Sequence, residues 1–161
     1  DLGRLSFRVV SVALQQPDQA TQGSPLSPSV MPDGALQILE AGLACCGVEA
    51  GAVDLVNESL GWVVSPVDEQ ALSHILVVAG TVTHALEATV IAAYNSLAQP
   101  RVVIAFGACA ITGGPYWDSY SVVPGAQEVI PVDLHVPGCP PTPQDLARAL
   151  DQAMQLVHQH D

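Results

Sequence analysis

The sequence predicts an α/β fold in which a parallel sheet is covered by helices on both faces. Short apolar runs that are typical of buried strands occur at residues 36–39, 62–64, 75–79 and 102–106. Segments with the 3.6-residue period of amphipathic helices accompany these runs. The alternation favours parallel strands joined by helical crossovers, in a flavodoxin-like layering with the site-forming loops at one edge of the sheet.

Two helices are expected from their apolar faces. The first lies between the last two strand candidates, and its apolar residues are Leu86, Val90, Ala93, Tyr94 and Leu97. The second begins at Thr142, because Pro143 at the first helical position and Asp145 in the first turn are typical of a helix N-terminus. Its apolar stripe is Leu146, Leu150, Ala153, Met154 and Val157.

The 161 residues are enough for about one domain with a sizeable core. Residues 1–33 lack periodicity over most of their length and are rich in Pro, Ser and Gln, so we expect an irregular N-terminal segment there. Residues 34–161 are expected to form a single α/β domain, and this part contains every cysteine.

Composition limits the classes of partner. Hydrophobic residues make up 49% of the chain, which favours extensive contact with other subunits. No apolar stretch reaches the roughly 18 residues that a membrane span needs, so we expect no direct bilayer span. A net charge of −12, with only four basic Lys or Arg residues, argues against nucleic-acid binding because such a chain repels phosphates.

The four cysteines are the residues that indicate chemistry. Cys45 and Cys46 are adjacent, Cys109 and Cys139 follow at long intervals, and each position lies where an apolar run meets a turn. Because strand ends of an open α/β sheet gather at one edge, three loops there are expected to bring the four thiols together. Four thiolates suit a tetrahedral zinc ion or a 4Fe–4S cluster.

The spacing of the cysteines favours the cluster. Structural zinc sites usually take ligands in Cys-x₂₋₄-Cys pairs, which this sequence lacks. Adjacent cysteines do not easily chelate one small ion, but they can reach two different irons of a cubane. Glycines such as Gly107 and Gly138 allow the backbone to approach an inorganic core closely. Zinc, a disulfide and plain buried thiols remain the alternatives.

Several ordered motifs surround the cysteines. They are LACCGVE at 43–49, VVAGTVT at 77–83, FGAC at 106–109, YSVV at 120–123, IPVD at 130–133 and VPGCPP at 136–141. Together they resemble the 20-kDa-type iron–sulfur subunit shared by respiratory complex I (NADH-quinone oxidoreductase) and by membrane-bound energy-converting nickel–iron hydrogenases, including formate hydrogenlyases. The resemblance covers residues 38 to 156, and ordered motifs of this kind are far more specific than a lone glycine motif.

The resemblance implies that Cys45, Cys46, Cys109 and Cys139 hold one terminal 4Fe–4S cluster, the last carrier before quinone or a nickel–iron site. The chain would then be an electron-transfer subunit of a multisubunit oxidoreductase, with the substrate chemistry in partner subunits. Those partners would be a large subunit of the complex I 49-kDa or hydrogenase type and further iron–sulfur and membrane subunits. The implied location is the cytoplasmic side of the membrane, peripheral through these partners. A zinc-stabilised or metal-free structural subunit is the alternative.

Departures from the family pattern bear on the electron partner. Complex I versions have an arginine where this chain has Val67, and methionines where it has Ala-Gly-Ala at 50–52. Hydrogenase versions usually have Cys-x-x-Cys in place of the adjacent Cys45 and Cys46. Because features of a quinone pocket are changed, we expect a nickel–iron site as the electron partner, with quinone reduction as the alternative.

Three further residues have competing interpretations. The resemblance makes Glu49, three residues after Cys46, a candidate for proton-coupled tuning of the cluster; otherwise it is a carboxylate favoured by the helix dipole. Asp133 is expected to orient the backbone before the last cysteine loop, with contact to a partner subunit as the alternative. Trp117 is expected to be a packing residue, with an electron relay as the alternative.

Overall fold

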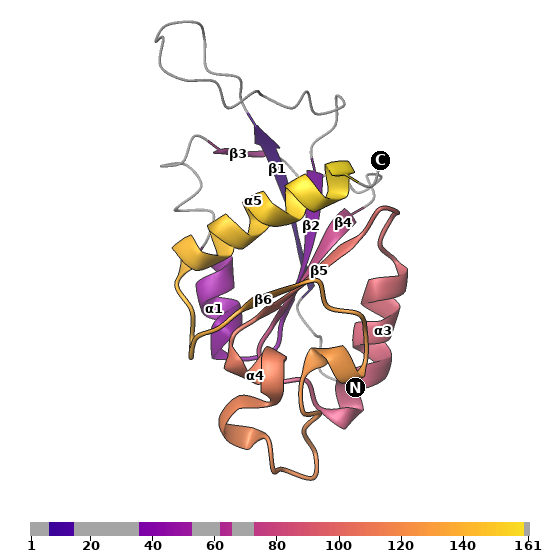
Figure 1. Cartoon of the computed structure of the whole chain (residues 1–161), viewed down its shortest axis with the longest axis vertical. Coiled ribbons are helices and arrows are strands. Elements are labelled where there is room, and N and C mark those ends of the chain that lie inside the picture. The colour runs from indigo at the N-terminus through magenta and orange to yellow at the C-terminus, as the bar shows by residue number, and fades with distance from the viewer. Residues whose placement is uncertain (1–6, 15–35, 53–61, 66–72, 160–161) are drawn as a thin grey trace, which may run out of the picture.

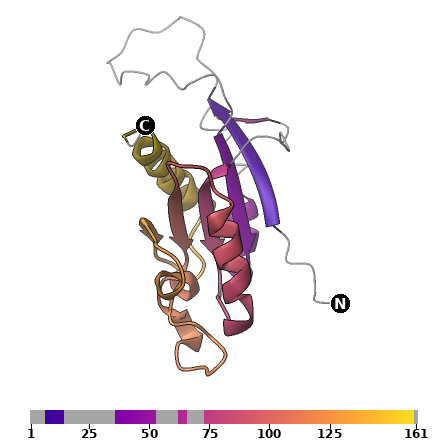
Figure 2. The ribbon, with the colours of Figure 1, turned by 90° about the vertical axis from the view of Figure 1, so that its right-hand side faces the viewer.

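The computed structural model describes residues 7–14, 36–52, 62–65 and 73–159. Within them, one sheet lies at the centre and helices pack on both of its faces (Figures 1 and 2). The strands are β1 (Phe7–Leu14), β2 (Leu36–Gly42), β3 (Trp62–Ser65), β4 (Ser73–Ala79), β5 (Val102–Phe106) and β6 (Leu134–Val136). The helices are α1 (Cys45–Gly51), α3 (Glu87–Asn95), α4 (Ala108–Thr112) and α5 (Pro143–Gln159), with short 3₁₀ turns η2 (His84–Leu86), η3 (Gly114–Tyr116) and η4 (Ala126–Glu128).

The strand order is β3-β1-β2-β4-β5-β6. Strands β2, β4, β5 and β6 run parallel, which confirms the predicted flavodoxin-like α/β fold. Strand β1 is antiparallel to both β2 and β3, so the sheet as a whole is mixed. Strand β1 also lies within residues 1–33, and the expectation of an irregular segment is therefore wrong at Phe7–Leu14. Residues 1–6 and 15–35 lie outside the described part, and the domain boundary after residue 33 stays a prediction.

Alternate residues of the central strands supply two separate cores. On one face, Ile75, Val77 and Ala79 of β4 join a cluster with α1 and α5. On the other face, Leu76 and Val78 pack with α3 and α4. Strand β5 is buried along its whole length and contributes side chains to both cores. This is expected of a parallel strand that is covered on both faces. The predicted strands at 75–79 and 102–106 are confirmed.

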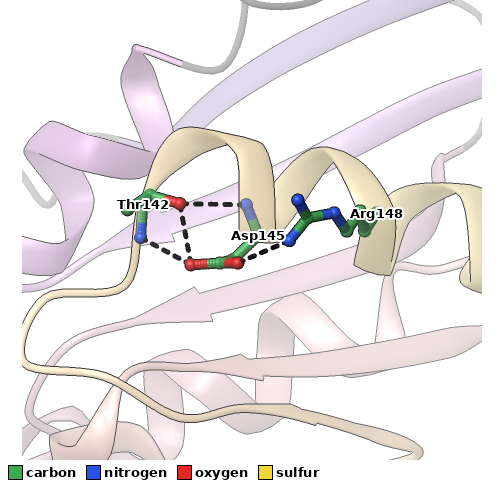
Figure 3. Close-up of polar contacts among 3 residues, drawn as sticks. All are labelled: Thr142, Asp145 and Arg148. Atoms are coloured by element: carbon green, nitrogen blue, oxygen red, sulfur yellow. Dashed lines mark hydrogen bonds and ion pairs between the residues drawn. The ribbon is translucent and has the colours of Figure 1, made fainter.

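Helix α5 begins where the sequence predicts. Thr142 lies at the N-cap, and its hydroxyl donates to the Asp145 carboxylate at 2.7 Å while the Asp145 N–H donates back to that hydroxyl at 3.3 Å (Figure 3). The Thr142 N–H and the Arg148 guanidinium also donate to Asp145, at 3.1 and 3.0 Å. This is a capping box with aspartate in place of glutamate. It fixes the chain direction directly after Cys139.

Among the described residues, no helix combines the length and the apolar character that crossing a membrane requires.

Replacing Thr142 with alanine tests the capping box. We expect Thr142→Ala to lower the free energy of unfolding by about 1 kcal/mol, since it removes the hydroxyl that accepts from one N–H and donates to Asp145. Thr142→Ser, which keeps the hydroxyl, is the control. These hydrogen bonds lower the pKa of Asp145, so the stabilisation is complete above about pH 4 and is lost as the pH falls further. Urea unfolding from pH 2.5 to 7 measures both effects; equal loss in the Ser and Ala variants would contradict the assignment.

Candidate metal centre

The four cysteines lie on loops that follow the carboxyl ends of three parallel strands. Cys45 and Cys46 open α1 after β2, Cys109 is the second residue of α4 after β5, and Cys139 follows β6 (Figure 1). Since β2, β4, β5 and β6 are parallel neighbours in that order, these loops emerge at one edge of the sheet. The predicted gathering of the cysteine loops at one sheet edge is confirmed.

Backbone hydrogen bonds hold each of the three loops beyond the strands. The loop before Cys45 is bonded to the end of β4, and the segments before Cys109 and Cys139 are bonded to each other. The bonds run from Leu43 N to Ala79 O (2.9 Å), from Gly107 N to Val136 O (2.8 Å) and from Ala108 N to Gly138 O (2.8 Å). The parallel pairing of β5 and β6 thus continues up to the residue before each cysteine.

Two glycines leave room for cysteine side chains. Gly107 has φ +97°, and a Cβ built on it would overlap Sγ of Cys46. Gly114 has φ +57°, and a Cβ there would lie 2.9 Å from Sγ of Cys109. Each position combines a positive φ with a close approach to a thiol, so a side chain is excluded by conformation and by space. The backbone forms a cradle around the two thiols.

The thiols differ in burial. Cys46 and Cys109 are buried, with 1% and 5% of their surface exposed, whereas Cys45 and Cys139 are exposed. All four are free thiols. Burial raises the pKa of Cys46 to about 11, with further increases from its neighbour Cys45, including their hydrogen bond, and from Cys109 and Cys139. The influence of all three on Cys46 indicates that the four sulfurs share one electrostatic environment.

The donor set fits an iron–sulfur cluster. Within the part of the chain that the structure describes, no three His, Cys, Asp or Glu side chains are placed to hold one metal ion. A cubane asks for something different, because each thiolate binds its own iron and the four sulfurs surround a larger body. Four thiols on three loops, with glycine backbone beside two of them, match that requirement. The ligand role itself stays a prediction.

The other sequence-based candidates lie in different places. Glu49 is half-buried on α1, beside the residues that face the core, Cys46 and Ala50. Its tuning role stays a prediction. Asp133 bonds to the start of β5: its N–H donates to Val103 O at 3.0 Å and its carboxylate accepts from Val103 N at 2.8 Å. Asp133 therefore orients backbone, as expected. Val67 lies outside the described residues.

An exposed aromatic surface next to Cys109 was not predicted from the sequence. The segment 113–120, here called the aromatic loop, begins beside Cys109 and carries Tyr116, Trp117 and Tyr120 with 58%, 67% and 96% of their surface exposed. The expectation that Trp117 is a packing residue is wrong. The loop is held by its own hydrogen bonds, and Val122 pairs with Thr83 just beyond it. The available signal was the density of aromatic residues in a chain with only 4% of them.

A buried carboxylate was also missed. Glu40 on β2 is only 7% exposed, the one charged side chain in the described core. The strand candidate at 36–39 stopped just before it, whereas β2 continues to Gly42. An acidic residue inside an apolar strand pattern was the signal that could have found it.

Comparisons with known proteins match most of the chain. Residues 43–153 match the family model described as NADH ubiquinone oxidoreductase, 20 Kd subunit. An NADH-quinone oxidoreductase subunit of Streptomyces griseus is 42% identical over 127 residues, covering 76% of this chain and 53% of the relative. The corresponding subunit of Carboxydothermus hydrogenoformans is 45% identical over 112 residues, covering 67% of this chain and 66% of the relative. The chain thus spans between about half and two thirds of these relatives.

A solved structure also resembles this fold. A chain of the membrane-bound sulfane sulfur reductase, an archaeal respiratory membrane complex, superposes with a TM-score of 0.61 at 27% identity. The match covers 77% of this chain and 71% of the other.

Replacing Gly107 tests the cradle. We expect Gly107→Ala to destabilise the fold by about 1 to 3 kcal/mol or more, because its φ is one that only glycine adopts easily and its Cβ would displace Cys46. Gly42→Ala is the matched control, since its Cβ would meet its nearest atoms at 3.6 Å, an ordinary contact. Urea unfolding measures the difference, and equal stability of the two variants would contradict the cradle.

Proposed function

The chain belongs to the family of the 20 Kd subunit of NADH ubiquinone oxidoreductase, and we propose that it is the electron-transfer subunit of a complex I-like oxidoreductase, holding one 4Fe–4S cluster on Cys45, Cys46, Cys109 and Cys139. The observation that carries the proposal is the meeting of all four cysteines on three loops at one sheet edge. When bound, such a cluster accepts and donates one electron at a time.

The residues of this chain hold and shield that group. Cys46 and Cys109 are buried and would hold the cluster on the side away from water, and the exposed Cys45 and Cys139 would supply the other two ligands. The free Cys46 thiol holds its proton well above neutral pH, and therefore ligation must displace that proton. Gly107 and Gly114 keep side chains out of the space beside the sulfurs. Burial and backbone approach are among the features that set cluster potentials.

We propose that a large subunit of the complex I 49-kDa or hydrogenase type docks on the cysteine edge. Two of the four cysteines are exposed there, and the aromatic loop, which begins beside Cys109, presents Tyr116, Trp117 and Tyr120 to solvent. Tyr and Trp on a fixed backbone supply large contact area at low entropy cost, which is the profile of interface hot spots. Through that subunit and others the chain is held at the cytoplasmic side of the membrane.

Two electron partners are candidates, each supported by one observation. The changes at 50–52 and at Val67 remove features of a quinone pocket and favour a nickel–iron site. The names of the curated relatives, NADH-quinone oxidoreductase subunits, favour quinone. The similar chain of a sulfane sulfur reductase belongs to a complex named for another substrate. Family membership alone therefore does not identify the electron partner. Two Cys-x-x-Cys pairs in the neighbouring large subunit would identify nickel–iron chemistry; quinone-dependent reoxidation without them would identify quinone.

Single substitutions of the cysteines test the cluster. Wild-type protein is expected to contain about four iron and four sulfide per chain and to give an EPR signal on reduction. Each of Cys45→Ser, Cys46→Ser, Cys109→Ser and Cys139→Ser should lose iron or change that signal, because serine is a harder ligand than thiolate. Thr112→Ser, an exposed substitution close to Cys109, is the control. Zinc in place of iron, or an unchanged signal in the Cys46 variant, would overturn the ligand set.

Substitutions in the aromatic loop test the docking surface. Trp117→Ala and Tyr120→Ala should each weaken the association of this chain with its large partner about tenfold or more, since truncating an interface aromatic commonly costs over 1 kcal/mol. Ile91→Ala is the matched control, because Ile91 is an exposed apolar residue on α3 and outside the loop. Co-purification under increasing salt measures the effect. Loss of association in the Ile91 variant alone would place the interface elsewhere.

A further inference from the structure

Glu40 occupies the layer of the fold that also contains a cluster cysteine. In the β2–β4 register Glu40 stands beside Val77, whose side chain lies in the core between the sheet, α1 and α5. Residues side by side in register share a face, so the Glu40 side chain lies on this face too. Cys46 belongs to the same core cluster, from the α1 side. A buried carboxylate and a buried cluster ligand therefore share one apolar layer.

The carboxylate extends toward the cysteine edge. A Cβ built on Gly42 would lie 3.6 Å from Oε1 of Glu40 and also 3.6 Å from the Cα of Gly47, the residue after Cys46. Glu40 therefore reaches along β2 toward its carboxyl end, to the base of the turn that leads into α1. With 7% of its surface exposed, its charge is poorly screened by water.

The residues that stand around Glu40 come from strands β1 and β4 and from helices α1 and α5. On β1, Arg8 stands opposite Glu40 in the register, a position at which a cationic residue favours an ionised carboxylate. On β4 the register neighbour is the apolar Val77, and on α1 the titratable residues are the cysteines and the half-buried Glu49. The buried residues of α5 are apolar. Glu40 is thus the buried carboxyl on this face of the described sheet.

We propose that Glu40 is an electrostatic tuning residue for the cluster, an inference that rests on the proposed function. An ionised Glu40 in this apolar layer would oppose the addition of an electron to a cluster held by Cys46, and so it would lower the reduction potential of that cluster. The residue acts through the field it creates and touches no electron donor or acceptor. Glu40 would therefore determine how low the reduction potential of an electron donor must be for that donor to reduce the cluster.

A redox titration of the intact complex tests this role, with dithionite as reductant and the EPR signal as readout. Glu40→Gln removes the charge and keeps the shape, so the midpoint potential should rise, favouring the reduced form by up to about tenfold at fixed ambient potential (about 59 mV for one electron). Glu40→Asp withdraws the charge from the cysteine edge and should give a smaller rise. Glu128→Gln, which removes an exposed carboxylate on η4, should leave the potential unchanged.

The outcomes separate the two proposals. If wild-type protein lacks iron, sulfide and the EPR signal, the proposed function fails. If the wild-type cluster is present and Glu40→Gln has the wild-type potential, only the tuning role of Glu40 is overturned. If Glu40→Gln does not assemble, Glu40→Asp decides: a rise supports the role and an unchanged potential overturns it. Equal shifts in Glu40→Gln and Glu128→Gln would show a general charge effect and also overturn it.

Discussion

The parallel pairing of β5 with β6 is the constraint on which the site depends. Asp133 bonds to Val103 at one end of this pair, and Ala108 bonds to Gly138 at the other. Between these ends the ladder fixes the register of two strands that are followed by cysteines, so their separation is set by backbone geometry. A shift in register would turn alternate side chains to the opposite face and separate the two cysteine loops. The relative positions of the Cys109 and Cys139 loops are therefore fixed by hydrogen bonds that lie outside the site.

The two apolar cores give this pairing its stability. Strand β5 is buried on both faces, so moving it would disturb the packing of α5 on one side and α3 on the other. Helix α5 is fixed at its start by the Thr142 and Asp145 box, directly after the Cys139 loop. The Cys139 loop is thus held by the packed sheet on one side and by the capped helix α5 on the other. The cysteines are positioned by elements that carry no redox chemistry themselves.

Sequence patterns predicted the parts of the fold with strong periodicity or distinctive chemistry. The apolar runs of β4 and β5, the stripe of α5 and the cysteine edge were all predictable. Helices α1 and α4 escaped because seven and five residues are too few to show a period. Strand β1 escaped because it precedes a Pro- and Ser-rich stretch and pairs antiparallel, so only its tertiary partners define it. The exposure of Trp117 depends on the turn at Gly113 and Gly114, which local composition does not reveal.

The unequal burial of the four thiols gives the proposed cluster a buried side and an exposed side. Cys46 and Cys109 are buried, and the buried Glu40 carboxyl shares the core layer of Cys46, whereas Cys45 and Cys139 are exposed. Residues on the buried side are closely packed, so they would act on the energy of an added electron from fixed positions. The outer side is open to a partner, whose docking would exclude water and strengthen every electrostatic interaction at the edge. Under the proposed function, the interior of the fold would set the resting potential of the cluster, and binding of a large subunit would adjust it at the exposed side.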